Sequence, residues 1–100
     1  MKITIDQVQK IIKENETQIK LFGVKEVYIF GSVARGETHD KSDVDVFVVF
    51  EENAKASLMT LAKLQLFLEL KLKTSVDLGT KNSLHRLLKD QILKEAIRVA

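Results

Sequence analysis

Residues 30–48 read FGSVARGETHDKSDVDVFV, and this stretch decides how the rest of the chain is interpreted. Residues 43–50, which include the end of this stretch, are rich in valine and phenylalanine and predict a strand. The residues before it, Val24–Phe30, are also β-formers and predict a second strand. Gly31 and Gly36 bracket SVAR, which predicts a brief helix between two turns. We therefore expect two strands joined by a short helix and a polar loop.

The flanking segments predict helices on both sides of these strands. Thr4 and Gln7 have the spacing of a capping box, and the apolar residues that follow recur at helical period, which predicts a helix over 5–22. Residues 54–73 are dominated by Ala, Leu, Lys and Glu, all good helix formers. A short third strand is expected over 74–78.

A last helix is expected to begin at Asn82 or Ser83 and to keep apolar residues facing inward as far as Ile97. Helices and strands then alternate along one domain covering 1–100, which indicates an α/β fold. The short link between the first two strands permits antiparallel pairing, and the long helix before the third suits a right-handed parallel crossover. We predict a small mixed three-stranded sheet flanked by helices.

Composition limits the classes of function. The 100 residues include 16 Lys+Arg and 14 Asp+Glu, so the net charge is only +2, and the basic residues alternate with acids along the chain. This pattern is typical of solvated faces and does not favour nucleic acid as a direct partner. The absence of cysteine excludes disulfides and thiolate metal sites. With no secretion signal and no apolar run of about 20 residues, we expect a soluble, cytoplasmic protein.

Gly31 and Ser32 form a candidate phosphate-binding turn. Glycine allows a ligand to approach the backbone, and free N–H groups at the start of a helix attract anions. The Ser32 hydroxyl and the Arg35 guanidinium would add a hydrogen bond and a positive charge. The alternative is an ordinary strand-to-helix turn, and the Gly-Ser pair alone does not decide between them.

Asp43, Asp45 and Asp77 are candidate metal ligands. Residues two apart on a strand point to the same face, so Asp43 and Asp45 would repel each other unless a hard cation such as Mg²⁺ lay between them. If the third strand lies beside the second, Asp77 reaches the same place, where it could bind a second metal and act as a base. The alternatives are a hydrated strand end for the pair and a turn-forming role for Asp77.

These residues carry a resemblance to a known family. Gly31-Ser32, Arg35-Gly36 and Ser42-Asp43-Val44-Asp45, followed by an apolar strand, resemble the GSxARGxxxxxSDxDxxV signature of minimal nucleotidyltransferases in the DNA polymerase beta superfamily. The order of the expected helices and strands on both sides is also similar. The motif position of Arg35 supports either the loop or a phosphate, and the resemblance does not decide which.

The resemblance implies an activity and the residues that perform it. It implies triphosphate contacts at Gly31 and Ser32, and metal ligation by Asp43, Asp45 and Asp77. Asp77 would also be the general base. ATP would be the substrate, with Mg²⁺, in two ions, as the cofactor, and AMP would pass to an acceptor hydroxyl.

The resemblance also implies a partner. Members of this size resemble antitoxins encoded with a HEPN-domain ribonuclease toxin, so the implied acceptor is a tyrosine hydroxyl on that toxin. The helix expected over 54–73 has more apolar residues, within 58–72, than one buried face needs. We favour a helix packed between the sheet and other helices; an interface with the partner or a homo-oligomer is the alternative. Two rival functions are nucleotidyl transfer to a small molecule such as an aminoglycoside, and a binding module without catalysis.

Overall fold

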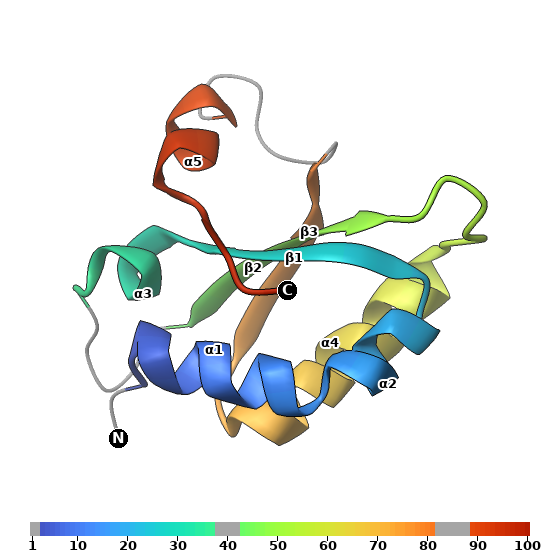
Figure 1. Cartoon of the computed structure of the whole chain (residues 1–100), viewed down its shortest axis with the longest axis horizontal. Helices are drawn as coiled ribbons and strands as arrows, with labels where there is room; N and C mark the ends of the chain where they lie inside the picture. The colour runs from blue at the N-terminus through green and yellow to red at the C-terminus, as the bar shows by residue number, and fades with distance from the viewer. Residues whose placement is uncertain (1–2, 38–42, 82–88) are drawn as a thin grey trace.

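The computed structural model describes residues 3–37, 43–81 and 89–100, and its centre is a four-stranded mixed sheet (Figure 1). The strands are β1 (Val24–Phe30), β2 (Val44–Phe50), β3 (Val76–Thr80) and β4 (Ile97–Arg98), in the order β3-β2-β1-β4. β1 is antiparallel to β2 and β4, whereas β2 and β3 are parallel. The α/β class and the pairing expected of the first three strands are confirmed.

The prediction of three strands is wrong, because the C-terminal segment adds a fourth. The final helix, α5 (Lys89–Glu95), ends at Glu95, and the chain then returns to the sheet as β4. The N–H of Val99 donates to the carbonyl of Val27 at 2.9 Å, and the N–H of Val27 donates to Ala100 at 3.1 Å. A two-residue strand is too short to show an alternating pattern. Asn82 and Ser83, where this helix was expected to begin, lie outside the described residues.

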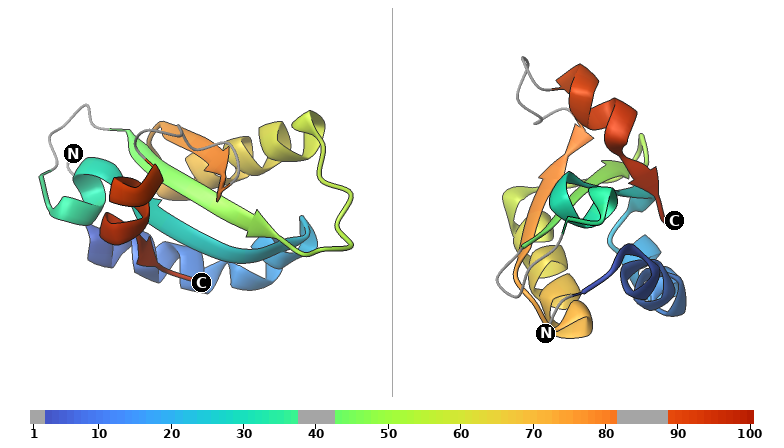
Figure 2. Two further views of the ribbon diagram at one scale, coloured as in Figure 1. Left: turned by 90° about the horizontal axis from the view of Figure 1, so that it is seen from above. Right: turned by 90° about the vertical axis from the view of Figure 1, so that its left-hand side faces the viewer.

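Three helices lie together beneath the sheet in Figure 2: α1 (Ile5–Glu14), α2 (Glu16–Leu21) and α4 (Leu58–Leu72). The capping box is confirmed by reciprocal hydrogen bonds between Thr4 and Gln7. The single helix expected over 5–22 instead breaks at Asn15. The side-chain amide of Asn15 donates to the carbonyl of Ile11 at 2.8 Å, and such local bonds compete with continued helix.

α4 begins later than predicted, at the cap residue Ser57, whose hydroxyl accepts from the N–H of Thr60. Its inner face buries Leu64, Leu68 and Leu72 against the sheet and the other helices. Its outer face exposes Leu58, Met59, Leu66 and Leu70 by 62–86%. α4 therefore packs against the sheet and α1, as expected, but these neighbours leave its outer face exposed.

The two faces of the sheet differ in what they carry. Buried valines and isoleucines of β1 and β2 pack with the helices in the main core. On alternate positions, Tyr28 stacks on Phe47 with ring centroids 4.7 Å apart, and Phe30 lies beside the same ring. Asp45 lies two residues from Phe47 and so shares its face. No helix in the described part of the chain has the length and apolar character needed to cross a membrane.

Candidate active site

The site begins where β1 passes into α3 (Gly31–Arg35). Gly31 has φ +72°, a conformation that favours glycine. The last residue of β1, Phe30, pairs with Asp45 of β2, which places Gly31 against the Asp45 side chain. A Cβ atom on Gly31 would lie 3.0 Å from Cγ and 3.3 Å from Cβ of Asp45, too close for ordinary contact. Glycine is required here by both the backbone and its neighbour.

The parallel pairing of β2 and β3 brings two of the predicted carboxylates together. Asp45 and Asp77 are register partners, and so are Val44 and Val76 just before them. The two valines are buried, so each aspartate points to the opposite face. The N–H of Val44 donates to the carbonyl of Ser75 at 3.0 Å and secures the start of the pairing. The expectation that β3 lies beside β2 is confirmed.

The electrostatics of Asp45 show that acidic groups converge here. Burial raises the pKa of Asp45, and the negative charges of Asp77 and Asp43 raise it further. The positive charge of Arg35 acts in the opposite direction and does not cancel them. Asp43, just before β2, and Asp77 are both exposed, whereas Asp45 is half-buried. The site therefore carries more negative charge than its surroundings neutralise.

The donor chemistry suits a hard cation, but the side chains are not closed around one. Carboxylate oxygens are the ligands that Mg²⁺ prefers, and a cation would relieve the repulsion at Asp45. Within the described ranges, no three Asp, Glu, His or Cys side chains are gathered closely enough to hold a metal ion as they stand. Asp43 and Asp77 are exposed, so both have room to change rotamer. The structure thus brings the three carboxylates into one neighbourhood without forming a metal cluster.

Arg35 joins α3 to α5. Its Nε donates to Glu37 and its Nη1 to Glu95, both at 3.0 Å, and these hydrogen bonds raise its pKa. Gln91, one turn before Glu95, donates to the second oxygen of Glu95 at 3.4 Å. In this structure Arg35 supports the α3 loop. Its influence on the pKa of Asp45 shows that the carboxylates are within electrostatic reach.

A cavity of about 240 Å³ opens beside this turn, between α3 and α5. It is lined by Phe30, Gly31, Arg35, Gln91, Ile92 and Glu95. The sequence placed Gln91, Ile92 and Glu95 in the expected last helix, with Ile92 facing inward, but it assigned none of them to the site. The one-turn spacing of Gln91 and Glu95 is common on exposed helix faces. The return of the chain to β1 through β4 is what places them at the site.

Two further serines among the described residues belong to the ends of secondary-structure elements. Ser57 caps α4, and Ser75 precedes β3. His39, His85 and Ser83 lie outside the described residues. Two larger cavities, of about 450 and 340 Å³, are lined by residues of α1, β4 and their neighbours and include neither Gly31 nor the three candidate metal ligands.

Comparisons with known proteins agree with this geometry. Residues 5–99 match the family model of the nucleotidyltransferase domain. The protein adenylyltransferase MntA of Thermococcus cleftensis is 36% identical over 98 residues, which are 97% of each chain. MJ0435 of Methanocaldococcus jannaschii is 49% identical over 77 residues, 77% of this chain and 81% of that one.

Solved structures show the same fold. One described as a minimal nucleotidyltransferase has a TM-score of 0.79 and 35% identity over 95% of both chains. A toxin–antitoxin structure with AMP-PNP has a TM-score of 0.68 and 22% identity, covering 95% of this chain and 71% of that one. A Shewanella oneidensis complex of a tri-AMPylated HEPN toxin with its MNT antitoxin gives a TM-score of 0.64 at 18% identity, over 92% and 71%. At 22% and 18% identity, the likeness to these two toxin–antitoxin structures establishes the fold alone.

Proposed function

Because this chain belongs to the nucleotidyltransferase domain family, we propose that it transfers AMP from ATP to a hydroxyl group on a partner protein. The observation that carries the proposal is the register pairing of Asp45 with Asp77 directly beside Gly31. Acidic side chains packed against a glycine turn are unfavourable without a ligand, and a metal–triphosphate complex supplies the missing positive charge and the anion together.

The nucleotide would lie along α3. Gly31 leaves its backbone open to the triphosphate, and the Ser32 hydroxyl would donate to a phosphate oxygen. When the nucleotide binds, the Arg35 guanidinium would leave its ion pair with Glu95 and bind a phosphate. The cavity between α3 and α5 adjoins this turn and would hold the nucleoside, with Ile92 and Phe30 as its apolar walls.

Asp43, Asp45 and Asp77 would hold Mg²⁺. When bound, the metal would neutralise charge on the phosphates during an in-line displacement. Asp77 is exposed, so an acceptor hydroxyl can reach it. The oxygen of the acceptor hydroxyl would form a bond to the α-phosphorus while Asp77 takes the hydroxyl proton. The bond from the α-phosphorus to pyrophosphate would break, and pyrophosphate would leave.

The proposed acceptor is a tyrosine hydroxyl on a HEPN-type ribonuclease in the cytoplasm, which would make this chain an antitoxin. The relative MntA is a protein adenylyltransferase, and a structural neighbour is complexed with an AMPylated HEPN toxin.

The proposal is tested by incubating the chain with the protein encoded by the adjacent gene, ATP and Mg²⁺, and measuring the intact mass of that protein. We expect a mass increase of one or more AMP units that Asp77→Asn abolishes while ATP binding, measured by calorimetry, is retained. ATP binding with no mass change for the unaltered chain would instead favour a binding module without catalysis.

A further inference from the structure

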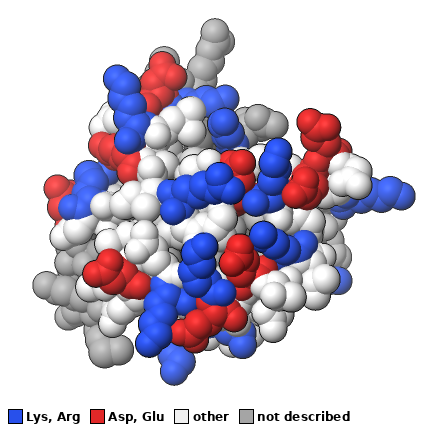
Figure 3. Space-filling model, in the orientation of Figure 1, with Lys and Arg blue, Asp and Glu red and all other residues white. Residues whose placement is uncertain are grey.

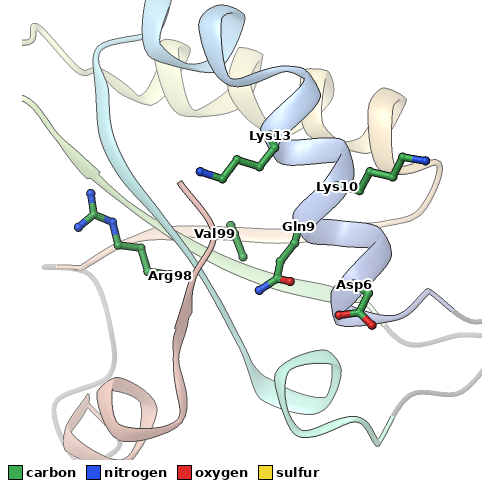
Figure 4. Close-up of a pocket in the computed structure, with 6 residues that line it drawn as sticks. All are labelled: Asp6, Gln9, Lys10, Lys13, Arg98 and Val99. Atoms are coloured by element: carbon green, nitrogen blue, oxygen red, sulfur yellow. The ribbon is translucent and has the colours of Figure 1, made fainter.

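A groove runs between α1–α2 and β4, on the face of the molecule shown in Figures 3 and 4. It is formed by the two larger cavities, of about 450 and 340 Å³, which share Lys13, Arg98 and Val99. Lys25 of β1 and Ala100 also line the second cavity, and one acidic residue lines each cavity, Asp6 the first and Glu16 the second. We call Lys13, Lys25, Arg98, Val99 and Ala100, with the space between them, the basic groove.

Positive charge gathers along the groove. In Figure 4 the Lys13 side chain extends from α1 towards β4 and Arg98, while Lys10 points away. Figure 3 shows lysine and arginine side chains across the middle of this face, with acidic side chains among them. The cations come from α1, β1 and β4, which explains why the sequence showed them only as scattered residues.

Nearby carboxylates neutralise only part of this charge. Arg98 and Lys25 both lower the pKa of the Glu26 carboxylate, but neither forms an ion pair with it. Of the lysines lining the second cavity, Lys20 is paired with Glu16 at 3.2 Å. No carboxylate in the described part of the chain forms an ion pair with Lys13 or Lys25. Arg98 donates through Nε to the carbonyl of Ala100 at 3.1 Å, and its remaining donors have no carboxylate partner among the described residues. Like charges held together in this way favour an anionic ligand.

The lining indicates which kind of anion fits. The half-buried Ala100 gives the groove a small apolar surface beside its charged rim, with the buried Val99 behind it, and protein–protein interfaces combine apolar and charged surface in this way. Neither cavity is lined by an aromatic residue, whereas proteins that bind single-stranded nucleic acid combine a basic groove with stacking platforms. Four of the five cations that line the two cavities are lysines. A lysine ammonium is a compact positive charge, whereas an arginine guanidinium is planar and can bind a phosphate through two hydrogen bonds.

We propose that the basic groove binds an acidic segment of the partner protein, with its carboxylates at Lys13, Lys25 and Arg98 and its small apolar residues beside Ala100. The identity of the partner rests on the proposed function, but the groove is separate from the catalytic residues. Docking here would hold the partner on the chain independently of the transfer step.

The test uses a fluorescein-labelled peptide of alternating glutamate and valine and follows its anisotropy at low ionic strength with the unaltered full chain. We expect binding that weakens about tenfold or more in Lys13→Glu/Lys25→Glu, because attraction at two rim positions becomes repulsion. Lys13→Gln/Lys25→Gln should give an intermediate loss. The matched control Lys55→Glu/Lys63→Glu makes the same change in net charge on exposed residues outside the groove and should lose little affinity.

Three results would overturn the proposal: no peptide binding by the unaltered chain, equal weakening in the control, or tighter groove-dependent binding of oligouridylate of the same charge. The last would make the groove a nucleic-acid site. Circular dichroism checks that each variant is folded. Because the assay contains no ATP, its failure leaves adenylyl transfer intact, and failure of transfer in Asp77→Asn leaves peptide binding unchanged.

Discussion

At the level of single residues, the site depends on the contact between Gly31 and Asp45. The antiparallel register of β1 and β2 fixes that contact, and the parallel register of β2 and β3 adds Asp77. The sequence motif identified all three residues, because glycine and aspartate at these spacings are specific. It could not show that the Asp45 carboxylate fills the space next to Gly31, since that contact is made only when the strands pair.

Replacing Gly31 by alanine should abolish transfer and destabilise the chain. The new Cβ would overlap Asp45, and the positive φ adds a backbone cost of about 1 kcal/mol. Gly36→Ala is the matched control, because Gly36 has nearly the same φ, +73°, and a Cβ atom there would meet no atom of the described residues within 4 Å, its chain neighbours aside. Urea denaturation should show a larger loss for Gly31→Ala, and equal losses would contradict the steric argument.

Asp45→Asn should raise stability at neutral pH while removing transfer. The folded chain holds the Asp45 carboxylate at a pKa above its ordinary value of 3.8, so its ionised form is disfavoured by folding. The unaltered chain therefore loses stability as pH rises from 3.8 through the raised pKa, and the neutral variant avoids that loss. Thermal melts should show a difference between variant and parent that grows across this window and is constant above it.

A gain in the usual range for removing one unfavourable charge contact, ~0.5–2 kcal/mol, is expected near pH 7. A variant that melts below the parent at neutral pH would show that Asp45 is stabilising, contrary to its place among like charges.

At the level of secondary structure, the sequence predicted the helices and strands that have a repeating or bracketed residue pattern. It did not predict the features that depend on tertiary contacts or on a single hydrogen bond. β1, β2, α3 and β3 were expected near their observed positions because each has β-forming residues or bracketing glycines. The break at Asn15 depends on one side-chain hydrogen bond to Ile11, and β4 depends on bonds to Val27. Neither leaves a repeating pattern in the sequence. The ion pair of Arg35 with Glu95, which joins α3 to α5, was missed for the same reason.

The ion pair between Arg35 and Glu95 allows a test of whether Arg35 contacts a phosphate or supports the α3 loop. If Arg35 moves to the triphosphate, Arg35→Gln should raise the KM for ATP about tenfold, the loss expected for one charge-assisted phosphate contact. Glu95→Gln should leave the KM unchanged or lower it, because it releases Arg35. Steady-state kinetics on both variants check this, and an equal rise in KM for both would show that Arg35 acts only by joining α3 to α5.

At the level of the whole molecule, the charged groove and the exposed apolar residues belong to different elements. The basic groove lies between α1–α2 and β4, whereas α4 carries the exposed Leu58, Met59, Leu66 and Leu70. Seen from above in Figure 2, α4 lies on the far side of the molecule from α1. Composition indicated neither feature, since the net charge is near zero and the apolar fraction is ordinary. Surfaces of this kind form only when the fold sorts the residues. The excess of apolar residues on this helix was visible in the sequence, but the side it would face was not.

The isolated chain should self-associate through the exposed face of α4. Leu66 and Leu70 are 62% and 76% exposed, so Leu66→Lys/Leu70→Lys should change the free energy of unfolding by no more than ~0.5 kcal/mol for each residue. The variant should sediment as a monomer at concentrations where the parent forms larger species. Identical sedimentation of the two proteins would show that this face does not mediate self-association.

The most direct test of the central claim is transfer of label from α-labelled ATP in host-cell lysate, with purified chain and Mg²⁺, beside the Asp43→Asn/Asp45→Asn variant. The proposed function predicts a labelled protein band that requires both aspartates, at the size of the acceptor. No band or small labelled product above the background of the variant would contradict nucleotidyl transfer by this site.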